Sequence, residues 1–388
     1  MLKELARDLS AMSVFAGILK DETVSAMVAV FSDPSAENCG RFVRLLYQHT
    51  DDLTDHLLNV LSEDENCFMM LHAKMREIPA VIDKAAHAEL KLIERASRVT
   101  PAEVAAEMTE KCYLAEWNVH EADLTAFYAN RMSELMTVGY GIFAKYHTFM
   151  LRDGRITPVK NPDPQRLSQL SGYENERRKV IENTLALLNG KPAANVLLYG
   201  DAGTGKSSTV KAVLNEYKDR GLRLIELKKS QLHDIPLIIS EIADNPLKFI
   251  LFVDDLSFSS DDDDFGALKA VLEGSVASKT PNIAIYATSN RRHLVKERFS
   301  DRSGDEIHVR DSREELISLS ERFGLKVTFT KPNKELYLKI VEQLAKQYGL
   351  DCDKDELFAK AESFALRRSG RSGRAARQFI EMVISGQL

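Results

Sequence analysis

The feature that most constrains this chain is a glycine-rich segment of eight residues, Gly200 to Ser207. It reads Gly-Asp-Ala-Gly-Thr-Gly-Lys-Ser, which satisfies the pattern GxxxxGK[ST], and it lies between an apolar run and a helical stretch. At average residue usage, a match arises in a chain of this length with a probability of about one in a hundred. A strand, a glycine-rich turn and a helix in this order predict a phosphate-binding loop.

Each residue type in this loop has a physical task in binding a nucleotide. Gly200, Gly203 and Gly205 let backbone N–H groups turn inward around phosphate, and the following helix adds the positive end of its dipole. Lys206 is predicted to neutralise the β- and γ-phosphates, and Ser207 to offer its hydroxyl to a metal ion. The predicted cofactors are therefore ATP and Mg²⁺. The other predicted nucleotide contacts in the loop are Asp201, Ala202, Thr204 and Ser208.

Polar residues follow two further apolar runs. Asp254 and Asp255 come directly after Phe249–Val253, and Asn290 follows the run that ends at Ala287. Asp254 is predicted to hold Mg²⁺ together with Ser207 of the loop. Asp255 is predicted to orient or deprotonate the attacking water, since a carboxylate within hydrogen-bond reach can accept its proton. Asn290 is predicted to position that water or to contact the γ-phosphate. Without the phosphate loop, all three would be ordinary turn residues at strand ends.

The pattern of the chain changes near residue 160. Before it, apolar residues recur at three- and four-residue spacing, which predicts a helical region over residues 1–155; Thr100-Pro101-Ala102-Glu103 is a helix start signal. Asp153-Gly154 and the proline-rich residues 157–164 are predicted to be a linker. Residues 165–330 are predicted to form an α/β core and residues 331–388 a helical lid.

Short apolar runs alternate with amphipathic helical stretches in the core. This alternation is typical of a parallel sheet covered by helices, in which strands buried on both faces are continuous apolar runs. The five predicted strands are Asn195–Tyr199, Leu222–Leu227, Phe249–Val253, Asn282–Ala287 and Leu325–Phe329.

Composition limits the class of protein. The 388 residues allow two or three domains, and the formal net charge of −6 provides no global basic field for nucleic acid or an anionic membrane. The four cysteines have neither zinc-ligand nor CxxC spacing, which favours a reducing, cytoplasmic setting. No run of 18 uncharged apolar residues occurs, so we expect a soluble protein without a membrane partner. The acidic run 261–264 is most simply a solvated loop, with magnesium or partner binding as the less favoured alternative.

The order of these motifs, followed by Ser320-Glu321-Arg322-Phe323-Gly324 and Gly373-Arg374-Ala375-Ala376-Arg377, resembles the AAA+ ATPases. The resemblance covers about Leu167 to the C-terminus and is most similar to a bacterial domain-of-unknown-function family of single-module ATP-binding proteins. It implies that Asn290 is the first sensor and that Arg374 is the second sensor, contributed by the helical lid. It also implies that Arg322 is an arginine finger that reaches a neighbouring subunit's nucleotide, and hence a homo-oligomer. The segment that ends at Tyr173 would lie by the adenine.

This sequence departs from the AAA+ pattern at one residue, and two of the assigned arginines have a second candidate. Asp255 stands where most AAA+ proteins have glutamate, and the shorter side chain must sit closer to the water, which leaves slow hydrolysis open. Arg298 is a second candidate for the finger and Arg377 a second candidate for the second sensor. Each arginine could instead form a surface salt bridge or snorkel along a helix.

We expect an ATP hydrolase that couples ATP turnover to remodelling of a protein partner or complex. The alternative is an ATP-dependent loader or processing factor on DNA, which Lys228 and Lys229 after the second predicted strand could touch, although a solvated corner is favoured for them. A nucleotide switch that hardly hydrolyses ATP is a third hypothesis, and a small-molecule kinase is least favoured. The sequence contains no motif that names the protein partner.

Overall fold

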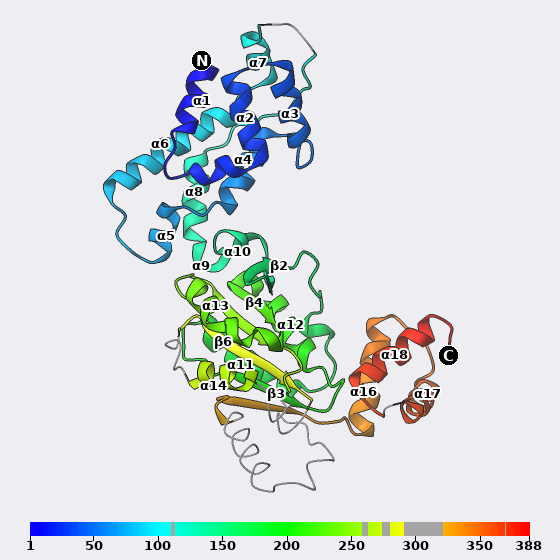
Figure 1. Cartoon of the computed structure of the whole chain (residues 1–388). Helices are drawn as coiled ribbons and strands as arrows, with labels where there is room; N and C mark the ends of the chain where they lie inside the picture. Colours follow the sequence, from blue (N-terminus) through cyan, green and yellow to red (C-terminus); the bar gives the residue numbers. More distant parts are fainter. Residues whose placement is uncertain (110–112, 258–262, 274–279, 291–320, 369) are drawn as a thin grey trace. The chain divides into compact units, whose positions relative to one another are not determined.

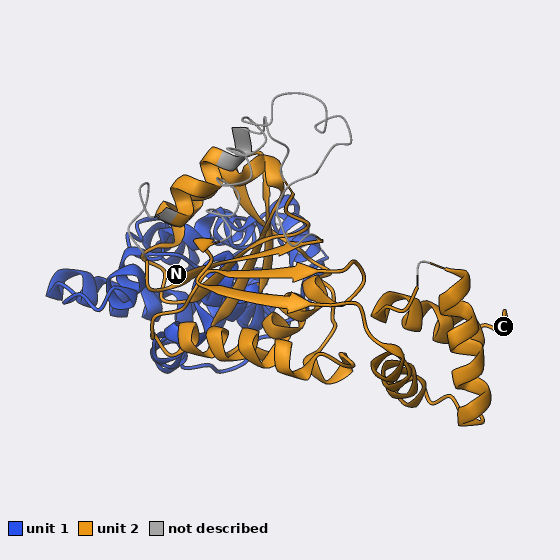
Figure 2. Ribbon diagram, turned by 90° about the horizontal axis from the view of Figure 1, so that it is seen from below, with its two compact units in different colours: residues 1–145 blue, residues 146–388 orange. Residues whose placement is uncertain are grey.

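The computed structural model describes residues 1–109, 113–257, 263–273, 280–290, 321–368 and 370–388 (Figure 1). The chain divides into two compact units, Met1–Lys145 and Tyr146–Leu388, which Figure 2 distinguishes by colour. No helix of the described residues is long and apolar enough to cross a membrane.

The first unit is built from helices in its described residues, apart from an isolated bridge between Asp52 and Asn118. The start signal at Thr100 is confirmed, because the Thr100 side chain accepts from the Glu103 backbone and Glu103 accepts from the Thr100 backbone. The helices are α1 (Leu2–Ser10), η1 (Ala16–Lys20), α2 (Glu22–Ser32), α3 (Ala36–Leu46), α4 (Leu53–Glu63), α5 (Cys67–Ala73), α6 (Ala80–Ser97), α7 (Pro101–Glu107), α8 (Leu124–Ser133), α9 (Leu135–Val138) and α10 (Ile142–Lys145).

A buried carboxylate organises the start of this unit. Glu89 of α6 is 7% exposed and accepts hydrogen bonds from the backbone N–H groups of Ser13, Val14 and Phe15. These groups lie between α1 and η1, where the chain turns and no helical carbonyl is available to them. Glu89 therefore fixes the turn that lets α1 and α2 pack on one apolar core.

The second unit contains a seven-stranded sheet in the order β2-β1-β4-β5-β6-β3-β7. All neighbouring strands are parallel except β1 and β2, which form an antiparallel hairpin. The strands are β1 (Thr148–Arg152), β2 (Arg155–Pro158), β3 (Val196–Gly200), β4 (Leu222–Leu227), β5 (Lys248–Val253), β6 (Ile283–Ser289) and β7 (Leu325–Phe329). All five predicted strands form, but the prediction of a five-stranded, wholly parallel sheet was wrong.

The two additional strands come from the segment that was predicted to end the helical region and to start a linker. Asp153 and Gly154 have φ of 49° and 72° and form the tight turn between β1 and β2. Left-handed values at both central positions are what a two-residue hairpin of type I′ requires, and Asp-Gly is a favoured pair for it. Residues 146–155, which were predicted to end the helical region, lie in the second unit.

Helices cover both faces of this sheet (Figure 2). Three more, α16, α17 and α18, follow β7; we call them the C-terminal helices. That residues 331–388 form a separate helical lid stays a prediction. The helices of this unit are η2 (Leu167–Gln169), α11 (Glu174–Leu188), α12 (Lys206–Tyr217), η3 (Lys218–Arg220), η4 (Lys229–Asp234), α13 (Ile235–Ile242), α14 (Asp263–Glu273), α16 (Lys334–Gln347), α17 (Lys354–Arg367) and α18 (Gly373–Ile384).

Strand order explains where a ligand can bind. The chain leaves β3 for β4, which lies beyond β6 and β5, and later returns to the other side of β3 with β7. Crevices at the carboxyl ends of parallel strands form where connections diverge in this way. The loop after β3 lies at such a point, beside the ends of β6 and β7.

Candidate nucleotide-binding site

The loop after β3 has the backbone that phosphate binding requires. Gly203 and Gly205 have φ of 75° and 94°, which are left-handed values that glycine adopts without strain. Gly205 is the N-cap of α12, which begins at Lys206. The loop therefore ends at a helix N-terminus, where free N–H groups and the helix dipole attract an anion.

The Lys206 ammonium is held in place by hydrogen bonds. Its Nζ donates to the carbonyl oxygens of Gly200 at 3.0 Å and Asp201 at 2.7 Å, and to Asn290 Oδ1 at 3.0 Å. Lys206 is 6% exposed, and this burial lowers its pKa, against the opposing effect of the nearby aspartates. A buried, positioned cation beside a helix N-terminus is well suited to bind phosphate.

A cavity of about 480 Å³ lies over the loop. It brings together most of the residues predicted from sequence, although Gly200 and Asp201 do not line it. The predicted residues that line it are Tyr173, Ala202, Gly203, Thr204, Gly205, Lys206, Ser207, Ser208, Asp254, Asp255, Asn290 and Arg374.

Asp254, the predicted metal ligand, accepts hydrogen bonds from two hydroxyl groups. Its Oδ1 accepts from Ser207 Oγ at 2.6 Å and from Thr288 Oγ1 at 2.5 Å. Hydroxyl and carboxylate oxygens are the ligands that Mg²⁺ prefers, so the donor set at Ser207 and Asp254 fits that ion. Thr288, which the sequence reasoning did not identify, also accepts from the Asp255 backbone N–H at 2.9 Å.

Asn290 connects the lysine to the second acid. Its Nδ2 donates to Asp255 Oδ1 at 2.6 Å, while its Oδ1 accepts from Lys206. The amide therefore orients the Asp255 carboxylate and the Lys206 ammonium at the same time. Because Asp255 has a left-handed φ of 53°, its side chain leaves the strand end at an angle that an extended residue would not give.

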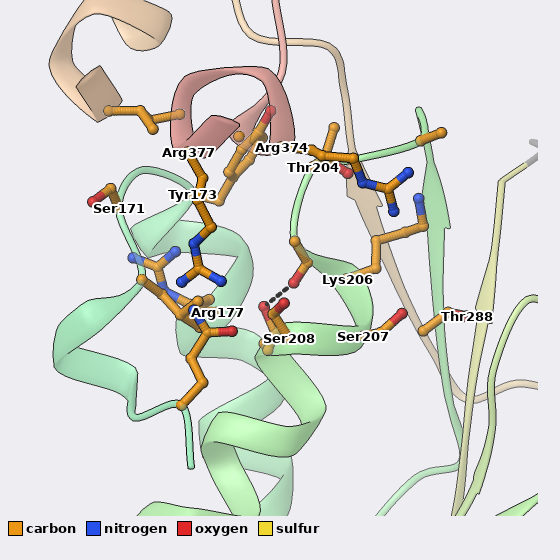
Figure 3. Close-up of a pocket in the computed structure, with 18 of the residues that line it drawn as sticks. Ser171, Tyr173, Arg177, Thr204, Lys206, Ser207, Ser208, Thr288, Arg374 and Arg377 are labelled. Carbon is orange, nitrogen blue, oxygen red and sulfur yellow. Dashed lines mark hydrogen bonds between the residues drawn. The ribbon is translucent and has the colours of Figure 1, made fainter. Parts of the chain in front are cut away.

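Two arginines of α18, Arg374 and Arg377, also line the cavity (Figure 3). The Arg374 side chain extends toward Lys206, whereas Arg377 extends toward Arg177 of α11. The Arg374 backbone N–H also donates to the Gly203 carbonyl at 3.1 Å. Of the two candidates for the second sensor, Arg374 thus lies near Lys206 of the phosphate loop, and Arg377 lies near Arg177.

Tyr173 lines the cavity, but its hydroxyl points to the chain that enters α16. The hydroxyl donates to the Thr330 carbonyl at 2.6 Å, and the ring lies 5.3 Å from the Phe329 ring. Burial raises the pKa of Tyr173, so the phenol stays protonated and keeps its donor. The predicted contact of Tyr173 with adenine stays a prediction.

Two further polar residues line the cavity: Arg177, which the sequence did not single out, and Ser171, which belongs to the segment expected to lie by the adenine. Arg177 is 9% exposed, donates to the Gly172 carbonyl, and has a pKa lowered by burial. Ser171 Oγ is buried and has no hydrogen-bond partner among the described residues. Arg177 belongs to a helical pattern without motif spacing, and only the fold brings it to the cavity.

Of the two finger candidates, the structure describes Arg322 alone. Arg322 precedes β7, whose first residue Leu325 pairs with Val196, while its last residue Phe329 pairs with Gly200 of the loop. Arg322 is therefore at the opposite end of β7 from the loop, and it is not among the described residues that line the cavity. Arg298 lies outside the described residues, as do Asp261 and Asp262 of the acidic run 261–264, whereas Asp263 begins α14.

The second unit matches the model of a family described as proteins of unknown function, DUF815, over residues 144–387. The chain belongs to the DUF815 family. The match begins just before the second unit, so the DUF815 region includes the β1–β2 hairpin, the sheet, the cavity and the C-terminal helices.

Curated relatives of this DUF815 protein confirm its resemblance to AAA+ ATPases. Replication factor C large subunits are 32% identical over 117 residues in Staphylothermus marinus and 26% identical over 209 residues in Thermofilum pendens. The 26S proteasome regulatory subunit 4 homolog of Dictyostelium discoideum is 31% identical over 124 residues. These matches cover 28%, 52% and 27% of this chain. The chain spans only 27%, 44% and 28% of the respective relatives.

Solved structures of RuvB from Thermotoga maritima are also similar to the DUF815 protein. The RuvB Holliday junction branch migration motor has a TM-score of 0.37 and 14% sequence identity, and the match covers 57% of this chain and 65% of that chain. A point mutant of the same protein gives a TM-score of 0.39 and 14% identity over the same shares.

Proposed function

We propose that this DUF815 protein binds ATP with Mg²⁺ in the cavity and hydrolyses it, and that turnover remodels a protein partner or complex. The observation that supports this most is the continuous hydrogen-bonded set from Lys206 through Asn290 to Asp255, beside the pair Ser207 and Asp254. The phosphate loop therefore brings together a cation, an amide, a general base and two oxygens that could bind a metal ion. Phosphoryl transfer needs this combination of groups.

Each side chain then has a defined task. Lys206 binds the transferred phosphate, and Arg374 adds a second positive charge from α18. Asp255 accepts the proton of the attacking water, and Asn290 holds that carboxylate in the accepting orientation. Ser207 and Asp254 would hold Mg²⁺, which when bound neutralises charge on the phosphate oxygens.

Apolar side chains in the cavity would hold the adenine ring of ATP. Leu170, Ile340 and Leu344 line the cavity, and the last two belong to α16. A flat aromatic base fits between such side chains, with Ser171 Oγ as a polar group that lacks a partner among the described residues. ATP would therefore contact the sheet and the C-terminal helices at once.

Arg322 is proposed to complete the site of a neighbouring subunit. Its place at the far end of β7 keeps it from the cavity of its own chain, so a role in phosphoryl transfer requires a second copy. A homo-oligomer, in which each subunit contributes Arg322 to the next, satisfies this geometry.

The test compares three variants in ATP binding and turnover. Lys206→Ala should abolish binding, and Arg322→Ala should leave binding intact but lower turnover by about a thousandfold. Arg220→Ala, which removes an exposed arginine of η3, is the matched control and should leave both unchanged. Turnover per subunit of the wild type should rise with protein concentration. A monomer that turns over ATP normally with Arg322→Ala would refute action across subunits.

Remodelling of a protein partner is tested with Asp255→Asn, which removes the proposed base. This variant should retain a partner in the presence of ATP, whereas the wild type should release it during turnover. Recovery of the same proteins with and without ATP, or with Lys206→Ala, would refute a nucleotide-dependent partner.

Action on DNA is the alternative function, because two curated relatives are replication factor C large subunits and Lys228 is exposed just after β4. It predicts salt-sensitive DNA binding that weakens in the variant Lys228→Ala with Lys229→Ala. Equal ATPase rates with and without DNA, together with no retention on DNA at low salt, would exclude this alternative.

A further inference from the structure

The phosphate loop is in direct backbone contact with the end of β7. Gly200 has a φ of 134°, and a Cβ built there would overlap the Phe329 carbonyl oxygen. Any side chain would collide with backbone, so glycine is required at this position for packing as well as for phosphate. The end of β7 therefore cannot move far without moving the loop.

Asp201 connects the loop to the residues just beyond β7. Its backbone N–H donates to the Phe329 carbonyl at 3.0 Å, and its carboxylate Oδ2 accepts from the Lys331 backbone N–H at 2.7 Å. Its own carbonyl accepts from Lys206 Nζ and from Thr204 Oγ1. One residue thus binds the phosphate-binding lysine on one side and the entry to α16 on the other.

Two more hydrogen bonds attach the C-terminal helices to the same site. Tyr173 donates to the Thr330 carbonyl, next to the residue that Asp201 holds. Arg374, in the first turn of α18, donates its backbone N–H to the Gly203 carbonyl of the loop. The C-terminal helices are therefore bound to the loop at their entrance and again at α18.

Asp201 does not line the cavity. It is exposed, and its carboxylate is directed to Lys331. A carboxylate in a loop that binds phosphate is electrostatically unfavourable unless it serves another contact. The contact it makes is with the segment through which the chain passes from the sheet to the C-terminal helices.

We propose that Asp201 is a positioning residue that couples the phosphate loop to the C-terminal helices. A rearrangement of the loop around phosphate is transmitted through the Asp201–Lys331 hydrogen bond to the start of α16, and the helices move with the loop. This coupling rests on the proposed function, because ATP is the ligand that rearranges the loop.

The experiment measures helix movement and turnover in the same protein. One dye is placed on Cys352, which is exposed between α16 and α17, and a second on η3 through Asp219→Cys. Cys67→Ser and Cys112→Ser remove the competing thiols, and excess unlabelled protein suppresses transfer between subunits. ATP should change the energy transfer of the otherwise wild-type chain.

Asp201→Ala should abolish most of this ATP-dependent change and lower kcat by about tenfold, the scale of one lost charge-assisted hydrogen bond, with KM changed by less than about threefold. Asp201→Asn keeps an oxygen that can accept from Lys331 and should restore both readouts to within about twofold of wild type. Glu335→Ala removes an exposed carboxylate of α16 instead and should behave as wild type. Rescue by asparagine separates a hydrogen-bond role from a role of the charge.

The outcomes separate this coupling from the proposed function. A wild-type chain that binds no ATP refutes both. A chain that hydrolyses ATP while Asp201→Ala keeps the full change in energy transfer retains the proposed function and refutes the coupling. An unchanged signal on ATP addition to the wild type, or failure of Asp201→Asn to restore the signal, also refutes the coupling.

Discussion

At the scale of single residues, the most informative position is Asp255. It is one of the few non-glycine residues with a positive φ in the described chain, together with Met75, Asp153 and Tyr173. Aspartate tolerates a left-handed backbone better than glutamate does, because its short side chain can hydrogen-bond locally. The departure from the usual AAA+ glutamate therefore has a backbone reason here, since the longer acid would strain the turn after β5.

Two substitutions at Asp255 should affect stability and turnover differently. Asp255→Glu should lower the free energy of unfolding by about 1 kcal/mol, because it strains a left-handed position. Asp255→Asn should leave stability unchanged but lower ATP turnover by at least about a hundredfold, since the base is lost. Urea denaturation and steady-state ATPase assays measure the two effects.

The control for Asp255 is Asp153, which shares a left-handed φ of 49° but lies in the β1–β2 turn. Asp153→Glu should reproduce the stability loss with unchanged turnover per folded molecule. If Asp255→Glu is as stable as the wild type, the backbone explanation is wrong. If Asp255→Asn turns over ATP normally, Asp255 is not the base.

The limits of prediction at this scale are physical. Lys206, Ser207 and Asp254 follow from the sequence because phosphate and metal chemistry fixes their residue types and spacing. Thr288 does not, since a hydroxyl within an apolar strand has no motif, and its value comes from the pairing of β6 beside β5. Arg177 gains its place only when α11 packs beside the cavity.

At the scale of elements, the same distinction separates the strands that were predicted from those that were not. β4 and β7 form with the predicted bounds, because strands buried among parallel neighbours are continuous apolar runs. The β1–β2 hairpin was missed because its strands are short, one ends in Pro158, and its Asp-Gly turn was interpreted as part of a linker. Proline is tolerated there because β2 is an edge strand.

The hairpin predicts where the second unit can be cut. Fragment 146–388 should fold. In fragment 160–388 the free energy of unfolding should be lower by about 4 kcal/mol or more, because the buried side chains of Phe149 and Leu151 in β1 are missing. This shorter fragment should also associate through the exposed edge of β4. Urea denaturation and size-exclusion chromatography compare the two. Equal stability and equal size of both fragments would show that the hairpin is dispensable.

At the scale of the whole molecule, one half-buried histidine links stability to pH. Burial, helped by the positive charges of Arg223 and Lys218, lowers the pKa of His147 to about 4. The unfolded chain therefore takes up this proton more readily than the folded one. The contribution of neutral His147 to the free energy of unfolding is complete above about pH 6.5 and is lost as pH falls toward 4.

The corresponding prediction concerns unfolding at pH 7 and pH 5. The wild type should lose about 1 to 2 kcal/mol of unfolding free energy through this group, a figure reduced for the partial exposure of the ring. His147→Gln should remove that part of the loss, and His233→Gln, which replaces an exposed histidine of the same unit, should not. The same pH dependence in all three proteins would contradict the assignment.

The place of β1 has a mechanical consequence. The chain passes from the first unit into the second through this strand, which lies between β2 and β4 and runs parallel to β4. A force applied through the first unit along β1 therefore loads the β1–β4 hydrogen bonds in shear, so that they must break together rather than one after another. The β1–β4 pairing thus resists a pull along β1 more strongly than it would resist peeling from one end of the strand.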